Sequence, residues 1–250
     1  MYQEERQLKI LDYLNENINM SVHDICELLD VSRDTARRDI LKLIEKGAAI
    51  RTHGGISLPV IRNTIEAYKE RVMKYSTEKK DIANKALEFI NEKEHYYFDV
   101  STTVCYLAEL IDKKVTVVTN SLDNLEILSE KENVNIYSTG GRLNKNNRFF
   151  YGDEVKTYIE ERLFDIAFLG AGSIMQTGLY FFDKEDVVIK QAAVKQARKV
   201  VLLVDSKKFN GFTYYKGLNW DQIDIIITDR RPPSVFINII KENGIELIIV

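Results

Sequence analysis

Basic side chains are concentrated in one short segment near the start of the chain. Residues 31–52 contain six basic and three acidic residues, and the apolar residues of the segment recur at helical spacing. With the apolar face turned inward, a row of basic side chains is left facing solvent. Guanidinium and ammonium groups bind phosphate oxygens and base edges, so this surface is suited to the major groove of DNA. The candidate contacts on this helix are Ser32, Arg33, Thr35, Arg37, Arg38 and Lys42.

Two helices are needed to position these side chains. Ser21 and Asp24 have the spacing of a capping box, so a first helix is expected to begin near residue 22. A turn at residues 30–31 then leads to a second helix, which Ser32 caps and Gly47 ends. The apolar stripe of this second helix consists of Ala36, Ile40, Leu43 and Ile44. The pattern predicts a helix-turn-helix, followed by a short β wing that ends near residue 58.

This region resembles the winged helix-turn-helix of the DeoR family of bacterial transcriptional regulators. In that family a VS-x-x-T-x-RRD-L run opens the recognition helix and an R-x-HGG run follows. Here residues 31–40 read VSRDTARRDI and residues 51–55 read RTHGG. Ala36 departs from the pattern, because a β-branched residue is usual there. The resemblance implies further DNA contacts from the wing, at Arg51, Thr52, His53, Gly54 and Gly55.

A solvated helix face is the alternative interpretation of the basic surface. Residues 1–58 as a whole carry eight basic and ten acidic side chains, and the chain has a formal net charge of −3. Any attraction to DNA must therefore come from the local patch. Two such patches, brought together in a dimer or tetramer, are expected to be needed for operator binding.

Length and composition limit the remaining possibilities. With 250 residues, 45% of them hydrophobic, the chain can bury the cores of one small and one medium domain. Cys26 and Cys105 fall in apolar helical patterns and are interpreted as buried residues rather than as a disulfide. The three histidines are scattered, so we expect no metal and no cofactor. No apolar run has the length of a membrane helix and the first residues do not resemble a signal peptide, so a cytoplasmic protein is expected.

The longer C-terminal part of the chain alternates strands and helices. Residues 59–76 are expected to form a linker, with a helix at 66–75, and Thr77 caps a helix that opens a second domain over residues 77–250. The alternation is typical of a parallel sheet with helices on both faces, so the predicted fold class is α/β, with a Rossmann-like three-layer domain after the winged head. The predicted strands are 96–100, 115–119, 134–138, 166–169, 200–204, 223–228 and 245–250. The predicted helices are 104–111, 122–130, 153–162, 184–197 and 233–243.

Small polar residues and glycines follow four of these strands. Ligands of parallel sheets bind beyond the carboxyl ends of the strands, so these positions are candidates for a binding site. Hydroxyls beside the free backbone N–H groups of a helix start can hold an anion such as phosphate. Each turn taken alone is more typical of helix capping or chain reversal. The candidates, strand by strand, are Asp99, Ser101, Thr102 and Thr103, then Asn120 and Ser121, then Gly140 and Gly141, then Gly170 and Gly172.

These stretches are similar to the D-x-G-T-T, TNS, GG and FLGA-x-G runs of the DeoR C-terminal domain. The resemblance implies a fold of the sugar-phosphate isomerase and coenzyme A transferase type, which senses a phosphorylated sugar or a related metabolite. Two lysines complete the implied effector site. Lys190 lies in an acidic-then-lysine helix that follows Asp183, and Lys208 lies in a run similar to DSSKFG.

The sequence departs from the family pattern at three places in this site. Ser101 replaces a glycine, residues 180–182 (YFF) replace small residues, and Asn210 replaces a glycine. These departures predict a narrower and more aromatic pocket. Either its effector differs from a common hexose phosphate, or the pocket has lost its ligand. A tyrosine or phenylalanine at these positions can equally be a packing residue.

Three functions are compatible with these residues. The first is a DNA-binding repressor of carbohydrate-metabolism genes, released from or tuned on its operator by a phosphorylated metabolite. The second is an isomerase-like enzyme, although the spacing of its possible bases is also that of an acidic helix start. Those possible bases are Asp99, Asp183, Glu185 and Asp186. The third is a regulator whose pocket binds nothing.

Overall fold

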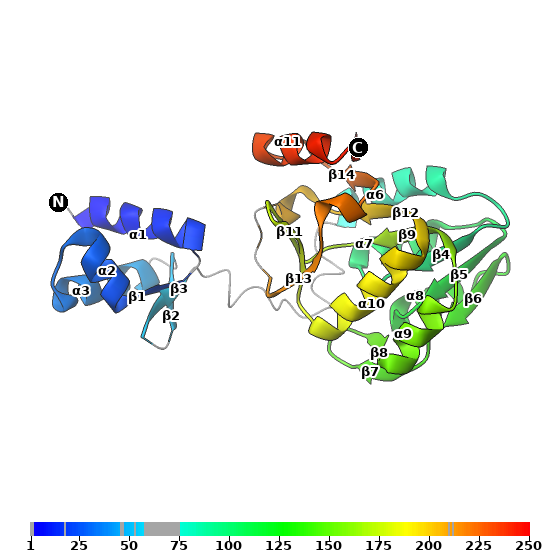
Figure 1. Ribbon diagram of the computed structural model, residues 1–250, viewed down its shortest axis with the longest axis horizontal. Helices are drawn as coiled ribbons and strands as arrows, with labels where there is room; N and C mark the ends of the chain where they lie inside the picture. Colours follow the sequence, from blue (N-terminus) through cyan, green and yellow to red (C-terminus); the bar gives the residue numbers. More distant parts are fainter. Residues whose placement is uncertain are drawn as a thin grey trace. The chain divides into compact units, whose positions relative to one another are not determined.

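The chain folds into two compact units, residues 1–65 and 66–250, in a computed structural model (Figure 1). The structure describes residues 3–17, 19–45, 48–52, 54–57, 76–209, 211 and 213–250. The predicted linker, apart from residue 76, and the predicted helix at 66–75 lie outside these ranges.

The first unit is a winged helix-turn-helix with an additional helix before it. Its three short strands form an antiparallel sheet in the order β1-β3-β2, and the core is built on Ile10, Leu14, Ile25, Leu43 and Ile56. The elements are α1 (Gln3–Asn17), β1 (Asn19–Ser21), α2 (Val22–Leu29), α3 (Arg33–Glu45), β2 (Ile50–Thr52) and β3 (Gly55–Ser57).

The predicted caps of the two motif helices are present. The Ser21 hydroxyl accepts a hydrogen bond from the Asp24 backbone N–H at 3.1 Å, and the Asp24 carboxylate accepts from the Ser21 N–H at 2.9 Å. Ser32 Oγ accepts from the Thr35 N–H at 3.3 Å at the start of α3. Helix α1 was not predicted, because its buried apolar positions are few and Ile10 and Leu14 alone give a weak helical stripe.

The second unit is a three-layer α/β fold around a parallel sheet of seven strands. The strand order is β15-β14-β12-β9-β4-β5-β6, and every neighbouring pair is parallel, as the sequence predicts. The sheet strands are β4 (His95–Phe98), β5 (Val115–Thr119), β6 (Val134–Ser138), β9 (Phe164–Leu169), β12 (Ala197–Leu203), β14 (Ile225–Thr228) and β15 (Glu246–Ile249). The helices are α6 (Ser76–Ala86), α7 (Thr102–Leu110), α8 (Leu122–Leu128), α9 (Asp153–Glu160), α10 (Lys184–Gln196) and α11 (Ser234–Glu242), with 3-10 turns at 87–89, 206–208 and 220–222.

Each face of the sheet has its own apolar core. Neighbouring strand residues point to opposite faces, so Phe98 packs with α6, α7 and α8 on one side, whereas Tyr97 packs with α9, α10 and α11 on the other. Both faces are therefore covered, which accounts for the nearly continuous apolar strands.

The short antiparallel strands of the larger unit were not predicted. They lie at the end of the parallel sheet where its strands have their carboxyl ends. One hairpin consists of β7 (Arg142–Asn144) and β8 (Phe149–Tyr151), and a small sheet consists of β10 (Ser173–Met175), β11 (Gly178–Phe181) and β13 (Tyr215–Leu218). Three- and four-residue strands are too short for a period-2 pattern to distinguish them from loops.

The direction of the chain through the sheet changes between β4 and β9. From β4 the chain adds β5 and β6 on one side, and it then returns to place β9, β12, β14 and β15 on the other side. The crevice beyond the carboxyl ends of β4 and β9 is thus the topological switch point, where ligands of open α/β sheets bind.

Candidate functional site

The outer surface of α3 carries the basic side chains that the sequence indicates. Arg33, Arg37 and Arg38 are exposed, and the buried side of the helix is formed by apolar residues such as Ala36 and Leu43. Thr35 is half-buried and its hydroxyl lies 3.0 Å from Ser32 Oγ, so these two groups serve the helix start.

Helix α1 makes polar contacts with the side of α3 that carries Asp39 and Lys42. Asp39 is fully buried, and its carboxylate accepts hydrogen bonds from Arg6 Nε at 2.6 Å and from Gln3 Nε2 at 2.9 Å. Gln3 Oε1 accepts from Lys42 Nζ at 2.6 Å. Lys42 is therefore exposed but engaged with α1, and Asp39 is a structural residue rather than part of the exposed surface. Because both partners precede the motif, no local pattern could have indicated this contact.

The wing is the hairpin of β2 and β3. Arg51 is exposed on β2, beside Thr52, and Gly54 has a φ of +95° in the turn, a conformation that favours glycine. Gly55 is buried in β3, where a Cβ would overlap the backbone of Met20 in β1. His53 lies outside the described residues.

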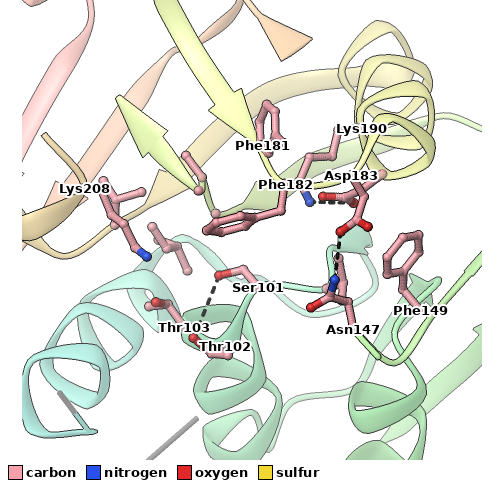
Figure 2. A pocket seen from close by; sticks show the side chains of 17 residues that line it. Ser101, Thr102, Thr103, Asn147, Phe149, Phe181, Phe182, Asp183, Lys190 and Lys208 are labelled. Atoms are coloured by element: carbon pink, nitrogen blue, oxygen red, sulfur yellow. Dashed lines mark hydrogen bonds and ion pairs between the residues drawn. The ribbon is translucent and has the colours of Figure 1, made fainter. Parts of the chain in front are cut away.

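A cavity of about 620 Å³, including the part open to solvent, lies at the switch point of the larger unit. Figure 2 shows side chains converging on it from the start of α7, the β7–β8 hairpin, the end of β11 and the start of α10. Eight of the thirteen effector residues predicted from the sequence line it, namely Ser101, Thr102, Thr103, Gly170, Gly172, Asp183, Lys190 and Lys208.

Asp99 joins the ends of the two strands at the switch point. It is fully buried; its Oδ1 accepts from the Ser101 N–H at 2.7 Å, and its Oδ2 accepts from the Gly170 N–H at 2.8 Å. The same Oδ2 lies 2.7 Å from Lys190 Nζ. Asp99 therefore lies behind the cavity wall and fixes the backbone and the lysine that line it.

Lys190 forms a buried cluster with two carboxylates. Its ammonium also lies 3.0 Å from Asp186 Oδ1 and 5.3 Å from the centre of the Phe181 ring. Burial raises the pKa of Asp186 to about 6, against the opposing effect of Lys190. Burial by itself lowers the pKa of Lys190, but the charges of Asp186 and Asp99 outweigh it and leave this pKa raised, so Lys190 is protonated at neutral pH.

The remaining wall is polar at Asp183 and aromatic around it. Asp183 precedes α10 without capping it by its side chain, and its carboxylate instead accepts a hydrogen bond from Asn147 Nδ2 at 2.9 Å. Phe149, Phe181 and Phe182 line the same space, in agreement with the predicted aromatic character of the pocket. Asn147 and Phe149 were not among the predicted residues; the polar run at 144–147 is the one signal for this loop.

Five predicted residues do not line the cavity. They are Asp99, Asn120, Ser121, Gly140 and Gly141. The last four follow β5 and β6, which lie on the far side of β4 from the switch point. Asn120 instead accepts from the buried Tyr97 hydroxyl at 2.8 Å and donates to the Phe150 carbonyl at 3.1 Å, and Ser121 caps α8. These groups hold the β7–β8 hairpin that supplies part of the wall.

Within the described residues, no group of histidine, cysteine and acidic side chains could hold a metal ion, and no helix there is long and apolar enough to cross a membrane. Cys26 and Cys105 form no disulfide. Cys105 is buried as predicted, whereas Cys26 is only partly buried, so the prediction that both are buried is wrong for Cys26.

A winged helix-turn-helix unit and a parallel α/β unit with a cavity at its switch point define the class of two-domain DNA-binding regulators. The chain belongs to the DeoR family. Residues 6–61 match the DeoR-like helix-turn-helix domain, and residues 74–230 match the DeoR C-terminal sensor domain. The family predicted from the sequence is thereby confirmed, and the protein is a transcriptional regulator rather than an enzyme.

Curated repressors are similar to the chain along nearly its whole length. The transcriptional repressor GlcR of Bacillus subtilis is 38% identical over 250 residues, which is 100% of this chain and 97% of the relative. The lactose phosphotransferase system repressor of Lactococcus lactis is 33% identical over 236 residues, 92% of each chain. The ribose 5-phosphate isomerase A of Methanocaldococcus jannaschii is similar in structure over 52% of this chain and 53% of its own, with 16% identity and a TM-score of 0.39. At that score the structural similarity does not bear on function.

Proposed function

We propose that the protein represses carbohydrate-metabolism genes and that a phosphorylated sugar, bound in the cavity, tunes its hold on operator DNA. The observation that carries this proposal is the composition of the cavity at the switch point. Hydroxyls of Thr102 and Thr103 lie at the start of α7, where backbone N–H groups favour an anion, and Lys208 lines the same cavity. The names of its repressor relatives support the direction of regulation and the link to sugars.

The DNA side of the proposal rests on the exposed face of α3. Arg33, Arg37 and Arg38 are assigned to the major groove and its phosphates, and Arg51 to the contacts of the wing. One such head offers few positive charges, so we assign the active species to a homodimer or homotetramer that places two heads on a symmetric operator. In domain terms, residues 1–58 bind DNA, 59–76 link, and 77–250 sense the effector.

The two activities are coupled through the arrangement of the heads in the oligomer. A ligand that favours one arrangement changes operator affinity, and by reciprocity operator DNA changes ligand affinity by the same factor.

A thermal-shift screen of the full chain against pentose and hexose phosphates tests the sensing function. At a ligand concentration of about 100 times Kd, binding stabilises the folded state by about 2.7 kcal/mol, which raises the Tm of the larger unit by roughly 5–10 °C. Each ligand that binds is then added to an operator-retardation assay. If no phosphorylated sugar shifts the Tm or releases operator DNA, the pocket does not sense, and the proposal is wrong in that part.

A further inference from the structure

The exposed face of α3 carries one apolar side chain among its charged ones. Leu41 is 49% exposed, and the buried side of the helix is formed by other residues. Among the described residues, the core of this unit packs on Ile40 and Leu43 of the same helix, and Leu41 takes no part in it. Burial within the unit therefore does not account for a leucine at this position.

The neighbours of Leu41 on this face are charged. Arg38 and Arg37 precede it by three and four residues, a spacing that places side chains next to one another on a helix. Both arginines are exposed, as is Asp34 one turn earlier. A protein partner that covered Leu41 would also have to desolvate two guanidinium groups, which is unfavourable unless acidic groups pair with them. A groove of DNA supplies the anions that these two groups need.

The spacing of these four residues is typical of a helix that reads bases. In homeodomains, the side chains of the recognition helix that reach base edges are spaced i, i+3, i+4 and i+7. Asp34, Arg37, Arg38 and Leu41 have the same spacing on α3, and all four are exposed. A helix that places the two arginines in the major groove therefore turns Leu41 toward the same base edges.

The base edges of the major groove offer one apolar group, the C5-methyl group of thymine. The other groups at these edges are hydrogen-bond donors and acceptors, for which a leucine side chain has no partner. Leu41 lies three to four residues beyond the two arginines, which is about 4.5–6 Å along the helix axis. Successive base pairs are about 3.4 Å apart, so this distance corresponds to about one or two base steps.

We infer that Leu41 is a specificity-determining residue, whose side chain contacts a thymine methyl group about one or two base pairs from the base that Arg37 or Arg38 reads. The inference rests on the proposed DNA contacts of α3 and adds a part of the operator sequence to them. Arginine pairs best with guanine, through O6 and N7. Each half-site is therefore expected to hold a thymine within about two base pairs of a guanine.

Sites that the full-length chain selects from a random pool of duplex DNA provide the first test. The parent is expected to enrich a site with this thymine, whereas Leu41→Ala is expected to enrich a site in which that position alone has become degenerate. Leu41→Met keeps a flexible apolar side chain and is expected to retain the thymine. Leu8→Ala is the matched control, because Leu8 is a leucine of the same unit that is 61% exposed on α1. This variant is expected to enrich the parent site.

Replacement of the selected thymine by deoxyuridine removes only the methyl group and leaves the base pairing unchanged. Loss of one apolar contact of this size is expected to weaken binding of the parent by about three- to fivefold in electrophoretic mobility shifts. Leu41→Ala is expected to bind the thymine and deoxyuridine duplexes within about twofold of each other, because its contact is already absent. Deoxyuridine at a thymine outside the selected site is the control for the DNA.

The outcomes separate this inference from the function itself. If the parent enriches no sequence, specific DNA binding fails and the inference fails with it. If the parent enriches a site but deoxyuridine weakens Leu41→Ala as much as the parent, the inference alone is overturned. The same holds if Leu8→Ala alters the selected site as Leu41→Ala does. An altered oligomeric state of Leu41→Ala in sedimentation, with an unchanged selected site, would show that Leu41 contacts protein and would also overturn the inference.

Discussion

The side chain of Ser101 occupies the space that a side chain on Gly170 would need. A Cβ placed on Gly170 would overlap both Oγ and Cβ of Ser101, and the two residues follow β4 and β9 at the switch point. Both backbone N–H groups also donate to Asp99. The serine that replaces the family's glycine is thus accommodated by a glycine on the neighbouring strand end, and its hydroxyl caps α7 by accepting from the Thr103 N–H at 3.2 Å.

Gly170→Ala is expected to destabilise the larger unit by about 1–3 kcal/mol, because the new methyl group must displace Ser101 or the strand end. Ser101→Gly alone is expected to cost only a few tenths of a kcal/mol of stability, because it changes only the residue that caps α7. Combined with Gly170→Ala, it is expected to recover most of the stability that Gly170→Ala loses. Urea unfolding followed by the fluorescence of Trp220, the chain's single tryptophan and a buried residue of this unit, measures each value. Strictly additive effects would contradict the proposed contact.

The buried hydrogen bond from Tyr97 to Asn120 is expected to stabilise the sheet and the hairpin over it. Tyr97→Phe leaves Asn120 Oδ1 buried without its donor, which costs about 1–3 kcal/mol. The exposed Tyr137, on β6, provides a matched control, and Tyr137→Phe is expected to change stability by less than about 0.5 kcal/mol. An equal loss in both variants, measured by the same fluorescence, would show that the hydroxyl of Tyr97 contributes nothing specific.

The sequence was sufficient for the parts of this fold that repeat a strong pattern. The parallel strands and their helices were predicted because short, mostly apolar strand patterns and helical patterns alternate over residues 96–250. Helix α1 was not predicted because its apolar stripe is weak. The short antiparallel strands were not predicted because they have too few residues to show a period. The order of the strands in the sheet could not be predicted either. That order decides that Ser101 and Gly170 meet, whereas Asn120 and Gly141 do not reach the cavity.

Asp186 is expected to make the larger unit less stable as pH rises. The pKa of Asp186 in the folded protein, about 6, is raised above the ordinary value of 3.8. Its contribution to the free energy of unfolding is therefore fully present below about pH 4 and is lost as pH rises through 6. Asp186→Asn removes this dependence while the pair of Lys190 and Asp99 remains. The free energy of unfolding of the variant, minus that of the parent, should therefore rise by about 1–3 kcal/mol between about pH 4 and pH 7. A flat difference across this interval contradicts the raised pKa.

The residue types of the candidate site were predicted more fully than the positions and contacts of those residues. Residue types and the resemblance indicated both lysines, but they could not distinguish Lys190, enclosed by two carboxylates, from Lys208 at the other end. That difference depends on Asp99, which is 91 residues from Lys190 in the chain. Contacts over such separations are set by strand order and register, and no local pattern encodes them.

Arg37 and Arg38 are expected to carry much of the operator binding, because both are exposed on α3 beside buried residues that fix the helix. Alanine at either position should cost about 1–3 kcal/mol of operator affinity if the side chain reads a base, and should weaken binding to all sequences and reduce the salt slope by about one if it binds phosphate. Lys9→Ala, on the exposed side of α1, removes the same charge away from α3 and should leave affinity within about twofold. Electrophoretic mobility shifts at several salt concentrations, with operator and unrelated DNA, distinguish these roles. Unchanged retardation of the operator by both arginine variants would remove α3 from the DNA interface.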